Sequence, residues 1–395
     1  MRLLLLLLLA ANGDPQEYSD EARESVRKLR VPAGLKVELF AAEPQFVNPV
    51  AMSFDEKGRV YVAETHRRHS SVLEVWDRRD WLDGDLAART VEDRVALYRK
   101  KLGAAADKLA ADSERVRVLQ DLGGKGHADF ADTFAAGFND LADGLGSSVL
   151  ARGNEVWYTC APKLWHLTVG PDGRASAREV LHDGFGVHMG SGAHDLHGLC
   201  FGPDGRIYFS MGDRGFHVQT KEGKTFDSPD SGAVLRCNPD GSDLEVFATG
   251  LRNPEQLCFD AQGNLWTGDN NADAGDRARW VYVAEGGDSG WRFGYQREVL
   301  KSPWMIERLW ALETASTAPS QVPPAGYVGH GPSGVAFYPG TGLPDEYAGR
   351  FFMCDFPGSV RSFTVRPKDA GFEVVDDREF LGELWPTDCK FGPDG

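Results

Sequence analysis

The fold is indicated by the stretch HGLCFGPDGRIYF, residues 197–209, in which two apolar runs flank a short turn. The first run ends at Phe201, the turn contains Gly205, and the second run ends in aromatic residues. Alternating apolar residues turn one face of a strand inward, and glycine supplies the positive φ that a tight turn needs. The stretch therefore predicts a β-hairpin.

The same hairpin pattern recurs along the chain. Its other copies are NPVAMSF with GRVYV (48–62), SSVL with VWY (147–158), NPEQLCF with GNLW (253–266) and PSGVAF with RFFM (332–353). A last copy begins at Pro386 and reaches Gly395 before its second strand. A four-stranded sheet built on one hairpin could not bury both faces alone, so six such sheets would close radially.

We therefore predict an all-β fold, a six-bladed β-propeller over residues 31–395 with the last blade truncated. A β-sandwich or two separate β domains would suit the composition, but neither would predict six copies of one hairpin. One stretch has helical spacing instead, because Val91, Val95, Tyr98 and Leu102 recur among charged residues. We expect a helical insertion over about 82–118, between the first two blades.

The N-terminus has the pattern of an export signal. Arg2 precedes a run of leucines at residues 3–9, and small residues follow. The run is shorter than the roughly 20 apolar residues that span a bilayer, and it lacks the polar face of an ordinary surface helix. We predict a signal peptide over 1–13, a linker over 14–30, and a location in the periplasm or cell envelope.

The composition excludes some classes of function. The chain has 43 Lys+Arg against 59 Asp+Glu, a net charge of −16, so nucleic acid is not an expected partner. Its six cysteines form no CxxC pair, which excludes a thiolate zinc site and a CxxCH haem attachment in these residues. Cys200 and Cys258 lie in apolar runs and are predicted to be buried thiols.

Histidines cluster in one glycine-rich loop that leads into the strand at 197–201. His182, His188, His194 and His197 fall within sixteen residues. Loops that precede the innermost strand of a propeller sheet open onto the central channel, where a neutral imidazole can act as a general base. The alternatives are structural histidines bonded to backbone carbonyls, or a metal site that this spacing does not specify.

Two further loops carry polar residues. Arg252 and Asn253 take the corresponding place in the next repeat, where they could bind an anionic group or form a salt bridge between repeats. The loop at 269–276 alternates carboxylate and amide oxygens, as a hard cation such as Ca²⁺ prefers. The candidate ligands in that loop are Asp269, Asn270, Asn271, Asp273 and Asp276. An EF-hand is excluded because Trp280 stands at its twelfth position, and a polar turn capped by Asx side chains is the alternative.

Several of these stretches together resemble a known superfamily. Residues 194–215 (HDLHGLCFGPDGRIYFSMGDRG) and 250–254 (GLRNP) are similar to soluble quinoprotein glucose/sorbosone dehydrogenases. The chain most resembles the N-terminal part of large membrane-bound dehydrogenases of planctomycetes and verrucomicrobia, which carry a haem-binding CxxCH module downstream. The resemblance implies a six-bladed propeller that binds pyrroloquinoline quinone (PQQ) with Ca²⁺ in its channel and oxidises a sugar or another alcohol or aldose.

The resemblance also implies residue roles. His194 would be the general base, with His197 as the near alternative, and Arg252 would stabilise the reduced cofactor. Asn253 and Glu255 would touch the cofactor, although the dehydrogenases usually carry glutamine at the second of these positions.

The loop at 269–276 lies where the superfamily has its metal-contacting loop, and Pro357 stands where it has a cofactor-binding lysine. Electrons would pass to a cytochrome c-type acceptor, a haem domain that lies beyond Gly395. The alternative function is a non-catalytic propeller that binds glycans or protein partners.

Overall fold

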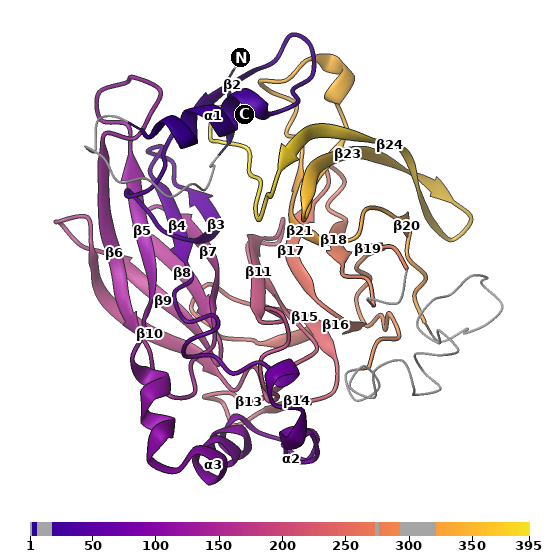
Figure 1. Ribbon diagram of the computed structural model, residues 1–395. Coiled ribbons are helices and arrows are strands. Elements are labelled where there is room, and N and C mark those ends of the chain that lie inside the picture. The colour runs from indigo at the N-terminus through magenta and orange to yellow at the C-terminus, as the bar shows by residue number, and fades with distance from the viewer. Residues whose placement is uncertain (1, 6–17, 273–275, 293–320) are drawn as a thin grey trace.

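The computed structural model describes residues 2–5, 18–272, 276–292 and 321–395, and antiparallel sheets dominate it (Figure 1). Five of the sheets have four strands each. The first is β3 (Pro49–Phe54), β4 (Val60–Glu64), β5 (Glu114–Gln120) and β6 (Phe130–Phe138), and the second is β7 (Gly146–Arg152), β8 (Glu155–Cys160), β9 (Lys163–Val169) and β10 (Ala175–Asp183). The third is β11 (Leu196–Phe201), β12 (Ile207–Met211), β15 (Gly232–Cys237) and β16 (Glu245–Leu251). The fourth is β17 (Pro254–Phe259), β18 (Leu265–Asp269), β19 (Arg279–Tyr282) and β20 (Gly326–Tyr327), and the fifth is β21 (Pro332–Phe337), β22 (Phe351–Asp355), β23 (Gly358–Lys368) and β24 (Gly371–Leu384).

The first strand of each sheet lies toward the centre of a ring. The strands β3, β7, β11, β17 and β21 contact one another in this order, and the last strands of the sheets lie toward the edges of the molecule (Figure 1). The first two strands of every sheet are the hairpins predicted from the sequence. The prediction of an all-β propeller is confirmed.

Apolar clusters fill the spaces between successive sheets. The cluster between the fourth and fifth sheets is the most aromatic, with Trp266 stacked on Trp280 at 6.0 Å between ring centroids. Trp280 also meets the edge of Phe363 at 4.8 Å. Burial of one such side chain contributes about 2 to 3 kcal/mol, so the packing of sheet on sheet stabilises the ring.

The position between the fifth and first sheets is filled by the two ends of the described chain. Residues 385–391 run between β21 and β3, where the backbone N–H of Met52 donates to Oδ2 of Asp388 at 2.9 Å and the hydroxyl of Ser333 donates to the carbonyl of Pro386 at 3.2 Å. A Cβ on Gly334 would lie 2.4 Å from Cα of Asp388, so the two backbones need a glycine to approach this closely.

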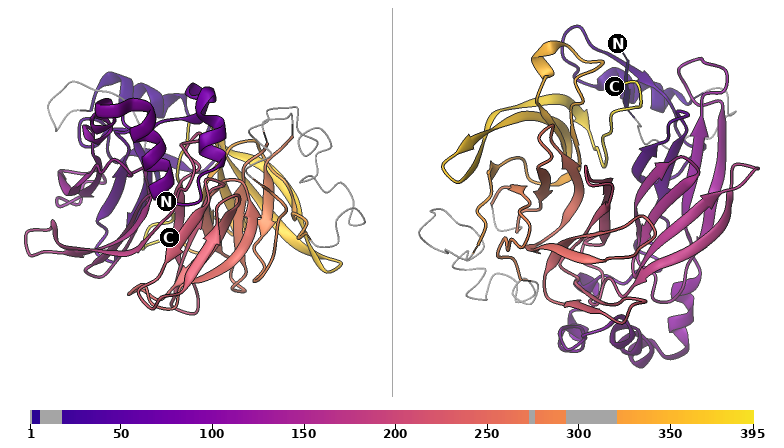
Figure 2. Two further views of the ribbon diagram at one scale, coloured as in Figure 1. Left: turned by 90° about the horizontal axis from the view of Figure 1, so that it is seen from below. Right: turned by 180° about the vertical axis from the view of Figure 1, so that it is seen from behind.

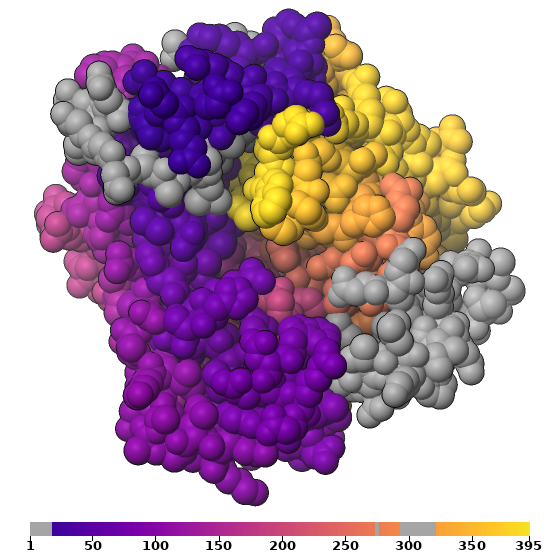
Figure 3. All heavy atoms as spheres, in the orientation of Figure 1, coloured from indigo at the N-terminus to yellow at the C-terminus, as the bar shows by residue number. Residues whose placement is uncertain are grey.

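Residues 29–46 pack on the same position from the N-terminal side. Leu29 belongs to the apolar cluster of the fifth sheet, and Phe40 and Phe46 belong to that of the first sheet. In Figure 3 the yellow C-terminal residues lie directly against indigo N-terminal ones. Residues 385–391 and an N-terminal segment therefore fill the place between the fifth and first sheets together.

The helical excursion is present, but its predicted position and extent were wrong. It comprises η1 (Val75–Asp77), η2 (Arg79–Trp81), α2 (Leu82–Leu86), α3 (Val91–Leu102) and η3 (Gly103–Ala110). These elements leave the first sheet between β4 and β5 and do not separate two blades. Residues 114–118 belong to β5, because Val116 and Val118 alternate with charged residues in a strand pattern.

The excursion lies on one side of the sheets (Figure 2) and is anchored to loops of the second and third sheets. Arg94 donates to the carbonyls of Gly186 and Ala142, each at 2.9 Å. Nδ1 of His188 lies 2.8 Å from the carbonyl oxygen of Asp85, which places this histidine under the excursion.

The remaining elements lie outside the five sheets. They are α1 (Asp20–Lys28), η4 (Asp345–Tyr347), the parallel pair β1 (Arg2–Leu5) with β2 (Lys36–Leu39), and the hairpin of β13 (Phe216–Gln219) with β14 (Thr225–Ser228). The predicted linker at 14–30 thus contains a helix, whose first turn is capped by the side chain of Ser19. All six cysteines are free thiols, and Cys258 is buried as predicted while Cys200 is partly buried.

Asp388 should hold the ring closed. Asp388→Ala removes the acceptor for the N–H of Met52, so we expect the free energy of unfolding to fall by about 2 to 3 kcal/mol. Urea unfolding measures this loss. Asp394→Ala, at an exposed carboxylate beyond this segment, is the control and should change stability by less than about 0.5 kcal/mol. Equal stability of the two variants would contradict this account of the closure.

Candidate active site

His194 lies in the loop before β11 and is oriented by a buried carboxylate. Its Nδ1 lies 2.7 Å from Oδ1 of Asp213, a residue that follows β12. Burial by itself raises the pKa of the Asp213 carboxyl, but the charge and hydrogen bond of His194, the charge of Arg252 and the indole of Trp291 together hold it below its usual value. The ionised carboxylate can only accept, so Nδ1 is the nitrogen that donates to it, and in the neutral form of the ring Nε2 is the nitrogen with the lone pair.

Nε2 of His194 has no hydrogen-bond partner among the described residues. This nitrogen is not fully buried, since it is absent from the buried side-chain atoms that lack a partner. The free nitrogen is therefore the one that can meet a ligand.

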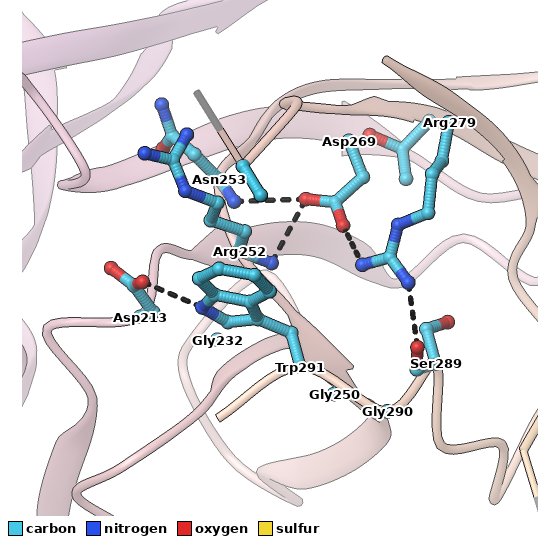
Figure 4. Close-up of polar contacts among 12 residues, drawn as sticks. Asp213, Gly232, Gly250, Arg252, Asn253, Asp269, Arg279, Ser289, Gly290 and Trp291 are labelled. Atoms are coloured by element: carbon cyan, nitrogen blue, oxygen red, sulfur yellow. Dashed lines mark hydrogen bonds and ion pairs between the residues drawn. The ribbon is translucent and has the colours of Figure 1, made fainter. Parts of the chain in front are cut away.

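Trp291 and Arg252 complete this arrangement (Figure 4). The indole Nε1–H of Trp291 donates to Oδ2 of Asp213 at 2.7 Å. The guanidinium of Arg252 lies over the same indole, 5.6 Å from the ring centroid. The predicted base and the predicted arginine, which are distant in sequence, thus meet around one buried carboxylate.

Sequence reasoning gave no role to Asp213 or Trp291. A signal was available for Asp213, which lies in the stretch at 194–215 that resembles the dehydrogenases. Neither position stands out from residue type alone.

Asp269 fixes the backbone of Arg252 and Asn253. Its Oδ1 accepts from the backbone N–H groups of both residues, at 2.9 and 2.8 Å (Figure 4). Its Oδ2 is paired with Arg279, whose guanidinium also donates to the carbonyl of Ser289 at 2.6 Å. The Asn253 side chain donates to Glu255 at 2.9 Å, while its Oδ1 is buried without a partner among the described residues.

The described part of the loop at 269–276 does not fit a bound cation. Both oxygens of Asp269 are engaged by N–H donors, and both oxygens of Asp276 accept from the backbone N–H of Ala272, at 2.9 and 3.1 Å. Asn271 donates to the carbonyl of Asp276 at 3.3 Å, and Asp273 lies outside the described residues. No group of three or more His, Cys, Asp or Glu side chains in the described ranges could hold a metal ion.

An open cleft of about 230 Å³ lies where the inner strands begin. Its walls come from all five sheets and from the closing segment, including Val50, Ser147, His197, Glu255, Asn270, Ser333, Phe356 and Asp388. Residues Gly192 and Ala193, which precede His194, also line it.

The predicted histidine cluster is divided by the structure. His197 lines the cleft, with Nε2 2.7 Å from the carbonyl oxygen of Ala193, whereas His182 lies on the outer strand β10 and His188 under the excursion. Burial raises the pKa of Glu255, and the charges of His197 and His194 oppose that shift. Both histidines therefore lie close enough to the cleft residue Glu255 to affect its carboxyl group.

The loop that follows β4 contributes a positively charged side chain, Arg68, to the edge of the cleft. Arg68 lines the cleft and is exposed, and its side chain has no hydrogen bond or ion pair in the described part of the chain. The loop is held by Glu114, whose carboxylate accepts from the N–H groups of Arg67 at 2.9 Å and His66 at 3.1 Å and from the hydroxyl of Thr65 at 3.1 Å. Burial raises the pKa of Glu114 to about 7 against the effect of these donors.

The fold and the cleft together define a β-propeller with polar side chains around its centre, and solved structures of similar architecture include dehydrogenases. A glucose dehydrogenase-type oxidoreductase from Thermus thermophilus is 16% identical and matches 88% of both chains, with a TM-score of 0.52. The PQQ domain of a pyranose dehydrogenase from Coprinopsis cinerea is 11% identical over 90% of this chain and 86% of its own, with a TM-score of 0.51. A carbohydrate-active enzyme of family AA12 from Trichoderma reesei is 14% identical over 91% and 90%, with a TM-score of 0.52.

The chain belongs to the family described as Domain of unknown function (DUF7133), which matches residues 21–395. No curated protein matches the sequence. Within the described ranges, no helix combines the length and apolar character needed to cross a membrane.

Asp269 should act through Arg279 and the backbone, and not through a metal. Asp269→Asn leaves a buried guanidinium without its carboxylate, so we expect the free energy of unfolding to fall by about 3 to 5 kcal/mol, in EDTA and in Ca²⁺ alike. Urea unfolding in both buffers checks this, with Asp276→Asn as the control. A loss that appears only in the presence of Ca²⁺ would make Asp269 a metal ligand instead.

Glu114 should make stability depend on pH. Because its pKa is about 7 in the folded state and near 4.5 when unfolded, its contribution is fully present below pH 4.5 and is lost as pH rises through 7. We expect the wild type to lose up to about 3 kcal/mol from this group between pH 4.5 and 8, and Glu114→Gln to lack this part of the dependence. Urea unfolding across this range measures both, and parallel curves for the two proteins would refute the assignment.

Proposed function

We propose that this protein is an exported oxidoreductase of the quinoprotein sugar dehydrogenase type. Its substrate would be a sugar or another alcohol bound in the central cleft, and its electron acceptor a cytochrome c-type protein. The single observation that carries the proposal is the set of contacts from His194 through Asp213 to Trp291 and Arg252, beside the cleft. The leucine run after Arg2 supports export.

The residues around the cleft fit PQQ, a planar quinone with three carboxylates. Arg252, held over Trp291, and Arg68, exposed on the wall of the cleft, supply positive charge for the carboxylates. Arg68 offers a cation in a cleft where Pro357 replaces the lysine that the dehydrogenases carry. When bound, PQQ would supply a two-electron acceptor for the hydrogen that leaves the substrate carbon.

His194 is placed to take the hydroxyl proton of the substrate. Asp213 fixes Nδ1 as the protonated nitrogen, so Nε2 is the basic atom, and the carboxylate then stabilises the imidazolium that forms. Loss of the hydroxyl proton to His194 and of the C–H hydrogen with two electrons to an acceptor gives the carbonyl product. The guanidinium of Arg252, held over Trp291, stabilises negative charge that develops beside it.

The proposal assigns no step to Ca²⁺, because both oxygens of Asp269 already have N–H donors. His197 takes a positioning role, since its Nε2 is bound to the backbone of the loop that carries His194.

Replacement of His194 should abolish most turnover without preventing binding. After reconstitution with PQQ, dye-linked oxidation of a sugar panel should fall by 10²- to 10⁴-fold in kcat for His194→Ala, because a general base contributes about that much. His217→Ala, at a half-exposed histidine on β13, is the matched control and should retain wild-type kcat.

Quinone binding is measured separately, by absorbance titration. Failure of the wild type both to bind PQQ and to oxidise any sugar would reject the proposal. Sugar binding that survives His194→Ala and Arg252→Ala, with no turnover in any protein, would favour a non-catalytic glycan-binding propeller.

A further inference from the structure

Two aromatic side chains are exposed together at the mouth of the cleft. Phe356 is 42% exposed and Trp385 is 71% exposed, and their rings meet edge to face with centroids 5.6 Å apart. The other exposed large apolar residues in the described ranges are Trp76, Leu122 and Phe130, and none of them lines the cleft. We call Phe356 and Trp385 the aromatic rim. Exposed aromatic pairs cost solvation free energy and commonly mark binding surfaces.

The aromatic rim is continuous with the cleft and stands on fixed backbone. Phe356 is itself a cleft residue, and its N–H donates to the carbonyl of Gly331 at 2.8 Å. The facing loop is held by Asp355, whose Oδ1 accepts from the N–H groups of His330 and Gly331 at 2.8 and 3.1 Å. Thr387, two residues after Trp385, also lines the cleft.

We propose that the aromatic rim is a second sugar subsite, so that the ligand of this protein is a neutral oligosaccharide whose terminal unit enters the cleft. The proposal deepens the proposed function and rests on it for the chemistry at His194. A pyranose ring has one face of C–H groups that packs on an aromatic ring, while its hydroxyls remain in water at the edges. A rim beside the cleft would hold the next unit of the chain in this way.

The charges around the cleft favour a neutral ligand over the other candidates. Among the described residues that line the cleft, Arg68 is the only Lys or Arg. The chain carries a net charge of −16, which disfavours phosphate-rich ligands and anionic lipid. Two side chains are also too small a surface for a stable protein interface, which covers about 800 Å² on each partner. An uncharged, polyhydroxylated chain suits both the charge of the cleft and the small area of the aromatic rim.

Isothermal titration of the full chain with glucose and with α-1,4 and β-1,4 gluco-oligosaccharides of two to five units tests the proposal. We expect affinity to rise about tenfold from one unit to two or three in at least one series. Trp385→Ala, at a residue outside the lining of the cleft, should remove this gain and keep the wild-type affinity for glucose, while Phe356→Leu should reduce the gain. Trp76→Ala replaces an exposed tryptophan of the excursion and is the matched control, in which the gain should persist. Thermal unfolding of each variant confirms that it is folded.

The possible results separate this inference from the proposed function. Affinity that does not depend on chain length, a gain that survives Trp385→Ala and Phe356→Leu, or no binding of any sugar would overturn the second subsite. A length-dependent gain without sugar oxidation would support the subsite and reject the redox proposal. Oxidation without any gain would support the redox proposal alone.

Discussion

The structure depends on one constraint: a four-stranded sheet with two apolar faces cannot stand alone in water. Each sheet is covered by its neighbours in the ring, which for the first and fifth sheets include the segments at 29–46 and 385–391. The stacked Trp266 and Trp280 show how completely such a space is filled. Because the sheets pack in a ring, the beginnings of the inner strands meet at one place. His194, Arg252 and the cleft are neighbours for that reason, although long stretches of sequence separate them.

The alternation of apolar residues in the sequence is sufficient to predict the hairpins. Runs that end in residues such as Phe54, Phe201 and Phe259 alternate clearly, and all five complete copies are inner strand pairs. The excursion was placed between blades because its helical pattern carries no information about which strand follows it. The sequence also does not predict that residues 29–46 pack between the fifth and first sheets. These residues gain their apolar partners only when the ring closes.

The site was predictable as far as residue chemistry allowed. A histidine and an arginine at equivalent places in successive repeats indicated a common channel, and they meet around Asp213. What the sequence could not show is which partner each polar group takes. Asp269 has the composition of a cation ligand, yet its oxygens face backbone amides and Arg279. A carboxylate oxygen can bind a cation, a backbone N–H group or a guanidinium. Tertiary packing decides which of these partners it meets, and the local spacing of residues does not show this.

The closure of the ring by both ends of the described chain has a consequence for synthesis. Asp388 and Thr387 form part of the wall of the cleft, and they are added among the last of the described residues. Sheets can form one after another as the polypeptide leaves the ribosome, but the first sheet must wait with one flank uncovered until residues 385–391 arrive. A nascent chain therefore acquires its ligand pocket only after these residues have emerged, when segments made early and late come together.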